Sequence, residues 1–191
     1  MQTRQIALAC CISAAFALAA CGSSQPSNQP ISATGQSASP KPAAGSGQHR
    51  AVLALNGQPE LTEDGKNIVV AVNVTNDGTG TFGSATEPDN VNLGAHAIDA
   101  AGKIVVNDLA RGHLPQIAPG ATEKASILLP VGETLGRSVQ LLPVQEHVGW
   151  FDVWGTKPLV VGPFQNCKDA VMGKVCDASG KALPSQAAGY P

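Results

Sequence analysis

The chain has 191 residues, of which 12 are Lys or Arg and 14 are Asp or Glu, so its formal net charge is −2. The charges are scattered, with no basic run or basic stripe. The counterion release that drives nucleic-acid binding therefore has no source, and we expect no nucleic-acid partner.

Residues 1–20 have the parts of an export signal. Arg4 supplies a positive charge, an apolar run follows at 6–17, and small residues lead to Cys21. A membrane-spanning helix is the alternative, but the apolar stretch 6–20 has 15 residues, and a span needs about 20. We expect a signal peptide over 1–20.

The end of this segment, Leu18-Ala19-Ala20-Cys21, resembles the lipobox at which bacteria cleave and lipidate exported proteins. The resemblance implies cleavage before Cys21 and attachment of fatty-acyl chains such as palmitate to it. Each buried methylene adds about 0.8 kcal/mol to anchoring, so two or three chains hold a protein at the membrane almost permanently. Gly22 rather than Asp follows the cysteine, and the sorting habit of this class then implies the outer membrane, facing the periplasm or the surface.

Two cysteines remain after the leader and the lipidation site are set aside, Cys167 and Cys176. In an oxidising periplasm such a pair indicates a disulfide bond. A metal or redox pair is the alternative, but the two have no CxxC spacing and no nearby histidine. A loop this short contributes less than roughly 3 kcal/mol, so we expect the bond to pin a C-terminal tail, 166–191.

Residues 21–50 are predicted to be the lipidated cysteine and a disordered linker. The segment 22–50 is rich in Ser, Pro, Gln, Gly and Ala, and Ile31 is its only large aliphatic residue. It cannot bury enough apolar surface to fold. A flexible chain of this length spans roughly 30 Å, which would let the folded part stand off the membrane.

Residues 51–165 carry short alternating apolar segments separated by Gly, Pro, Asn and Asp. This pattern predicts an all-β, immunoglobulin-like β-sandwich of about seven strands. We expect a hairpin turn at 100–102, and strands at 51–55, 67–76, 91–99, 103–108, 122–129, 137–147 and 157–161.

The stretch 76–161 resembles the immunoglobulin-like accessory domain of bacterial surface-polysaccharide glycosyltransferases and methyltransferases. The resemblance implies a sandwich with no catalytic residues of its own. Two departures matter: Ala97 stands where such domains often carry an aromatic core residue, and Pro143 interrupts a strand expected to be central, which implies a bulge or an edge. The matching residues are Asn76-Asp77-Gly78, Val91-Asn92-Leu93, His96, Asp99, Gly102, Val105, Asp108, Arg111, Leu114-Pro115, Pro119-Gly120 and the run 144–151.

Aromatic residues supply the candidate binding positions. On a strand, Trp150 and Trp154 would share one face and Phe151 would point to the other. A chain so poor in aromatic residues needs at least some of these rings in its core, so we expect most of the cluster to be buried; the alternative is a patch that stacks on sugar or docks a protein. Phe82 is a further candidate, because the loop 79–90 is long for a strand connection and offers little chance to bury a ring.

Motifs for catalysis and cofactors are weak. The GxGxxG match at 78–83 is not followed by a helix, which phosphate binding needs, and the histidines lack metal-ligand spacing. We therefore expect no metal, no cofactor and no enzymatic activity. The sequence predicts a non-catalytic, membrane-anchored envelope lipoprotein that acts as a protein- or glycan-interaction module. The alternative is an enzyme acting on envelope glycan with a loop-assembled site, for which Glu146 and Asp152 could pair as carboxylates.

Overall fold

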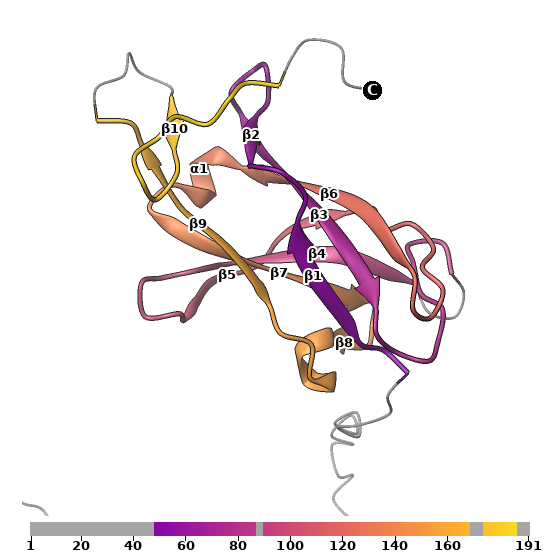
Figure 1. Ribbon diagram of the computed structural model, residues 1–191. Helices are drawn as coiled ribbons and strands as arrows, with labels where there is room; N and C mark the ends of the chain where they lie inside the picture. Colours follow the sequence, from indigo (N-terminus) through magenta and orange to yellow (C-terminus); the bar gives the residue numbers. More distant parts are fainter. Residues whose placement is uncertain (1–47, 87–89, 169–173, 187–191) are drawn as a thin grey trace, which may run out of the picture. The chain divides into compact units, whose positions relative to one another are not determined.

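A computed structural model describes residues 48–86, 90–168 and 174–186 (Figure 1). The described chain is almost entirely β-structure in two antiparallel sheets, as the sequence predicted. The first sheet contains β1 (Ala51–Leu55), β2 (Glu60–Leu61), β3 (Asn67–Asn76) and β6 (Thr122–Pro130). The second contains β4 (Val91–Ile98), β5 (Ile104–Gly112), β7 (Arg137–Gln145), β8 (Gly149–Trp150), β9 (Leu159–Asn166) and β10 (Val175–Cys176).

Two short helical turns join the strands. The first is α1 (Val131–Thr134) between β6 and β7, and the second is η1 (Phe151–Trp154) directly after β8. In the described residues no helix is long and apolar enough to span a membrane. The lipobox and nearly all of the expected linker lie outside the described residues.

Alternation along β3 builds the core of the first sheet. Ile68, Val70, Val72 and Val74 have no exposed surface, while the residues between them are partly exposed or polar. Each such aliphatic side chain contributes roughly 1.5–3 kcal/mol when fully buried. β6 lies beside β3 in antiparallel register, with Val70 opposite Ile127, so both strands turn their aliphatic residues toward the second sheet.

The turn between β4 and β5 lies where the sequence placed it. The Asp99 carboxylate accepts hydrogen bonds from the backbone N–H groups of Ala101 and Lys103, both at 2.9 Å. Gly102 has φ +80°, a value that glycine adopts without steric cost. The side chain of Asp99 and the freedom of Gly102 together close this hairpin.

β7 is a central strand even though it contains Pro143. On one side β7 pairs with β4 along its length, with Pro143 opposite Leu93. On the other side the pairing with β9 ends at Leu141, and β8 begins opposite Val144. Pro143 thus falls in the gap between β9 and β8, where its missing N–H breaks no ladder bond.

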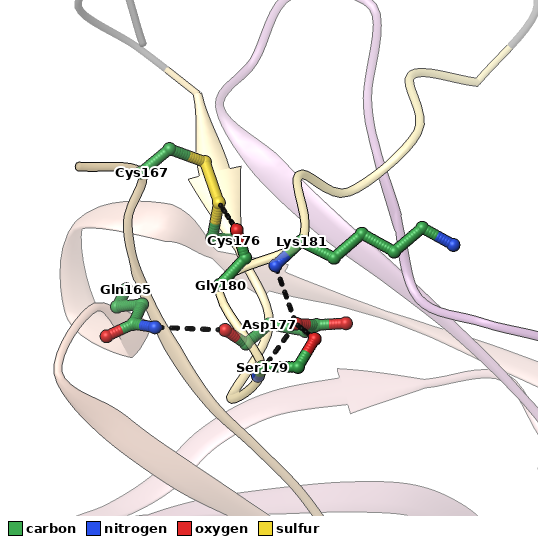
Figure 2. Close-up of a disulfide and its surroundings, with 7 residues drawn as sticks. All are labelled: Gln165, Cys167, Cys176, Asp177, Ser179, Gly180 and Lys181. Atoms are coloured by element: carbon green, nitrogen blue, oxygen red, sulfur yellow. Dashed lines mark hydrogen bonds between the residues drawn. A yellow bond between two sulfur atoms is a disulfide. The ribbon is translucent and has the colours of Figure 1, made fainter. Parts of the chain in front are cut away.

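The C-terminal segment adds to the second sheet and then reaches the first. Cys167 and Cys176 form the expected disulfide (Figure 2), and Val175, buried to 3% exposure, lies opposite Asn166 of β9. Beyond β10, Ser185 bridges to Leu61 of β2. The described tail is therefore an integral part of the sandwich wall.

A tight turn follows the disulfide. The carboxylate of Asp177 accepts the hydroxyl of Ser179 at 2.6 Å and the backbone N–H groups of Ser179 and Lys181 (Figure 2). These hydrogen bonds lower the pKa of Asp177, and the bond from the Ser179 hydroxyl has the largest effect. Gln165 donates to the backbone carbonyl of Asp177 at 3.1 Å, which ties the turn to β9.

The remaining differences concern element ends and very short strands. β5 extends to Gly112 and β7 ends at Gln145, two residues before the expected end. His147, with φ +63°, lies in the turn after β7. β9 runs from Leu159 to Asn166 instead of 157–161. The two-residue strands β2, β8 and β10 were not predicted, because two residues carry no periodic pattern.

Candidate functional site around Trp150

Phe82 is a core residue, and the expectation that its loop offers little chance of burial is wrong. Its side chain is 0% exposed. Its backbone pairs with that of Ile117 through two hydrogen bonds, of 3.2 and 2.7 Å, and its ring meets Phe151 edge-on at 5.3 Å. The loop turns inward because the segment containing Ile117 offers a backbone partner, so Phe82 cannot contact a ligand without unfolding.

Trp154 also belongs to the core. The chain turns after Trp150 into η1, so the expected continuous strand with both tryptophans on one face is wrong. Phe151 is fully buried and Trp154 is 8% exposed. Their rings meet edge-on at 5.2 Å, and the ring of His49 lies 5.4 Å from Trp154. Of the three candidate binding aromatics, only Trp150 remains partly exposed.

Trp150 lies on the outer face of the second sheet. It is placed by β8, where it pairs with Val144 of β7, and its ring reaches to Gly94 of β4. A Cβ atom at Gly94 would lie 2.5 Å from the ring and 2.8 Å from a guanidinium nitrogen of Arg111. Position 94 therefore requires a residue without a side chain if the tryptophan and the arginine are to lie there.

His96 and Arg111 hold the indole in place. The His96 ring centroid is 3.7 Å from that of Trp150, with 39° between the planes. The Arg111 guanidinium lies 4.6 Å from the ring centroid, a cation–π contact of about 0.5–1 kcal/mol at a partly exposed site. Both residues stand beside Gly94: His96 is two positions along β4 on the same face, and Arg111 is opposite Gly94 on β5.

A bulge in β5 supplies the partner of His96. The register shifts between Ala95 and Ala97, so extra residues of β5 lie opposite His96. Asp108, in this bulge, has φ +56°, a conformation that Asp tolerates better than most residues. Its backbone N–H donates to Nδ1 of His96 at 3.2 Å, which requires an unprotonated Nδ1. Burial lowers the pKa of His96, so the imidazole is neutral near pH 7.

Two carboxylates flank Arg111. Its Nη1 pairs with Asp108, and its Nε lies 3.4 Å from Oε1 of Glu146. The same Glu146 oxygen accepts the amide of Asn92 at 2.6 Å, and Asn92 accepts the hydroxyl of Ser84 at 2.6 Å. The side chains of Arg111, Asp108 and Glu146 are 31, 49 and 27% exposed. All three side chains are thus held in place by ion pairs and still reach solvent.

We call His96, Asp108, Arg111, Glu146 and Trp150 the outer-face cluster. It offers carboxylate acceptors, a guanidinium donor and the edge of an aromatic ring, the groups that bind hydroxyl- and amide-bearing molecules. The side-chain oxygen of Glu146 already contacts Arg111 and accepts a hydrogen bond from Asn92. Asp152, the other half of the carboxylate pair considered from sequence, is exposed and accepts the N–H of Val153. Among the described residues no group of His, Cys, Asp and Glu is arranged to hold a metal.

The sequence identified Trp150 as a candidate binding residue and Glu146 as a candidate carboxylate, but it did not bring these two together with His96, Asp108 and Arg111 as one site. The cluster comes from β4, β5, β8 and the turn after β7, and no local spacing connects β4 and β5 with the segment 146–150. A scan against protein-family models and a search of the curated proteins find no match for this chain.

Proposed function

We propose that this chain is a non-catalytic lipoprotein of the bacterial envelope, anchored through Cys21 in the outer membrane, and that its sandwich binds a surface glycan at the outer-face cluster. One observation carries the binding assignment. Trp150 and Arg111 are stacked in a single place over Gly94, where any side chain would displace them. The stack is partly exposed and is bordered by two carboxylates.

Preorganisation favours binding at such a surface. Ordering a long side chain when a ligand arrives costs about 0.5–1.5 kcal/mol, and here the ion pairs with Asp108 and Glu146 already order Arg111. Hydrogen bonds from sugar hydroxyls to ionised groups are stronger than those between neutral groups. A weak, hydroxyl-rich ligand can therefore gain affinity from these residues without paying to arrange them.

The lipid anchor is tested separately from the binding site. Mass spectrometry of the mature protein should show an N-terminus at Cys21 with added acyl mass, and Cys21→Ala should release the protein from the membrane fraction. A mature N-terminus elsewhere, without acyl mass, would overturn the anchor and leave the binding assignment standing.

Glycan binding can be followed by the emission of Trp150. The chain has two tryptophans, and Trp154 is in the core, so a bound sugar should change the emission of Trp150. The full mature protein, in a detergent without a sugar headgroup, is titrated with hexose, N-acetylhexosamine, amino-sugar and uronate oligosaccharides. We expect saturable changes that disappear in Trp150→Phe, and calorimetric binding that Arg111→Ala abolishes.

Arg137→Ala is the matched control. Arg137 is on the same sheet, but its guanidinium donates to the backbone carbonyl of Glu133, at the α1 end. Binding should survive this substitution. If no oligosaccharide binds, or if Arg111→Ala binds as well as Arg137→Ala, the outer-face cluster is not a glycan site. Capture of an envelope protein by the same face would then favour the protein-interaction alternative.

A further inference from the structure

We infer that the outer-face cluster selects sugars that are neutral or carry an amine and discriminates against acidic sugars. This inference rests on the proposed glycan binding and adds the class of glycan. It follows from how the charges of the cluster are already matched within the protein.

The guanidinium of Arg111 is shared between two carboxylates of its own chain, Asp108 and Glu146. An incoming carboxylate or phosphate would have to compete with both of them for this cation. Such competition weakens binding, because the incoming acid must displace a carboxylate that already lies against the guanidinium.

The local charge balance is negative. Arg111 contributes one positive charge, and Asp108, Glu146 and Asp152 contribute three negative charges, which gives 1 − 3 = −2. Asp152 belongs to the same neighbourhood, since its charge acts on His96. His96 adds no compensating charge, because its Nδ1 is an acceptor.

The same charges favour an amine. An ammonium group near Glu146 or Asp108 gains a charge-assisted hydrogen bond, whereas a carboxylate placed there meets two like charges. Exposed charges interact only weakly. Two net negative charges should therefore separate an acidic sugar from its neutral counterpart by roughly two- to thirtyfold in Kd.

The test compares probes that differ in one group. Cellulose- and chitin-derived oligosaccharides are the neutral probes, their C6-oxidised forms carry carboxylates, and deacetylated chitin oligosaccharides carry amines. Titration of the full mature protein should give the weakest binding for the carboxylate forms. Raising the salt from about 0.1 to 1 M shortens the screening length from about 10 to 3 Å, and should remove most of the discrimination.

Charge-neutralising variants identify the origin of the selectivity. Asp108→Asn retains an acceptor oxygen, and Asn tolerates a positive φ as Asp does. Glu146→Gln retains an acceptor for the amide of Asn92. Each should narrow the difference between neutral and acidic probes. Glu123→Gln is the control, because it removes the same charge from an exposed position on β6 in the other sheet, and should leave the difference unchanged.

The outcomes separate the two proposals. If neutral and acidic probes bind equally, or the acidic ones bind tighter, the charge selectivity is wrong while glycan binding stands. If Glu123→Gln narrows the difference as much as Asp108→Asn, the selectivity comes from overall charge and not from the cluster. If no probe binds, the proposed function is wrong and the selectivity is wrong with it.

Discussion

Gly94→Ala should disrupt the outer-face cluster at its centre. The new methyl group would lie 2.5 Å from the Trp150 ring and 2.8 Å from Arg111 Nη1, so the ring, the guanidinium or both must move. The atoms that it meets are the ends of side chains, so the strain can be relieved by displacing Trp150 outward. That displacement removes the contacts with His96 and Arg111.

The cost follows from those two contacts. An aromatic pair contributes about 0.5–1.5 kcal/mol and an exposed cation–π contact about 0.5–1 kcal/mol. Gly94→Ala should therefore lower the free energy of unfolding by about 1–2.5 kcal/mol, which agrees with the usual 1–3 kcal/mol for an overpacked site. Trp150 should also become more exposed, with a red shift of its emission.

Gly149→Ala is the matched control. Gly149 precedes Trp150 on β8, and a Cβ there would meet no atom within 4 Å. Urea unfolding and fluorescence spectra of both variants provide the comparison. If Gly94→Ala matches Gly149→Ala within about 0.5 kcal/mol, the variation expected at a neutral surface site, and its emission does not shift, then Trp150 is not held over Gly94 and the outer-face cluster is not assembled around it.

Three further predictions concern other parts of the fold. Phe82→Ala should lower stability by about 3–5 kcal/mol, the usual cost for a buried phenylalanine; a loss below 1 kcal/mol in urea unfolding would contradict its burial. Replacing Cys167 and Cys176 together by Ser should cost at most about 3 kcal/mol by the loop-entropy estimate and leave a cooperative transition, whereas an unfolded variant would show that the disulfide holds the whole domain. Burial lowers the pKa of His96, so below about pH 6.5 the unfolded chain binds more protons than the folded one. The free energy of unfolding should be highest above that pH, fall as the pH drops toward the lowered pKa of His96 and then level off. A His96→Asn variant, which keeps an acceptor for the Asp108 N–H, should lose this fall. If its unfolding free energy depends on pH as that of the unchanged protein does, the assignment to His96 is wrong.

The strands of the sandwich could be predicted where a long alternating pattern exists. β1 and β3 have the bounds expected from sequence. In β3, Val70, Val72 and Val74 alternate with the less apolar residues Ala71, Asn73 and Thr75. The disulfide was predicted from the number of cysteines and from the oxidising compartment that the export signal led us to expect. The same reasoning could not fix where strands end at a turn such as His147, because a positive φ at a non-glycine residue leaves no mark in the sequence.

The fates of the aromatic residues could not be predicted, because each depends on a distant partner. Phe82 is buried because the backbone of Ile117 lies beside it, and Trp154 is buried because the chain turns at Phe151. Scarcity of aromatic residues correctly favoured the core for most of the cluster. It could not indicate which ring stays at the surface, since that depends on the missing side chain of Gly94.

The bulge at Asp108 determines which substitutions in the cluster test ligand binding without also disturbing the backbone of β5. The bond from the Asp108 N–H to His96 is part of the bulge, and bulges re-aim side chains and commonly border functional sites. A substitution of His96 that removes this acceptor disturbs the path of β5, and so moves Arg111 as well. Arg111 contributes only its side chain to the cluster, so Arg111→Ala leaves that bond in place. Loss of binding in Arg111→Ala with little loss of stability would therefore identify a contact with the ligand, whereas loss of both would mean that the arginine acts mainly by holding Trp150.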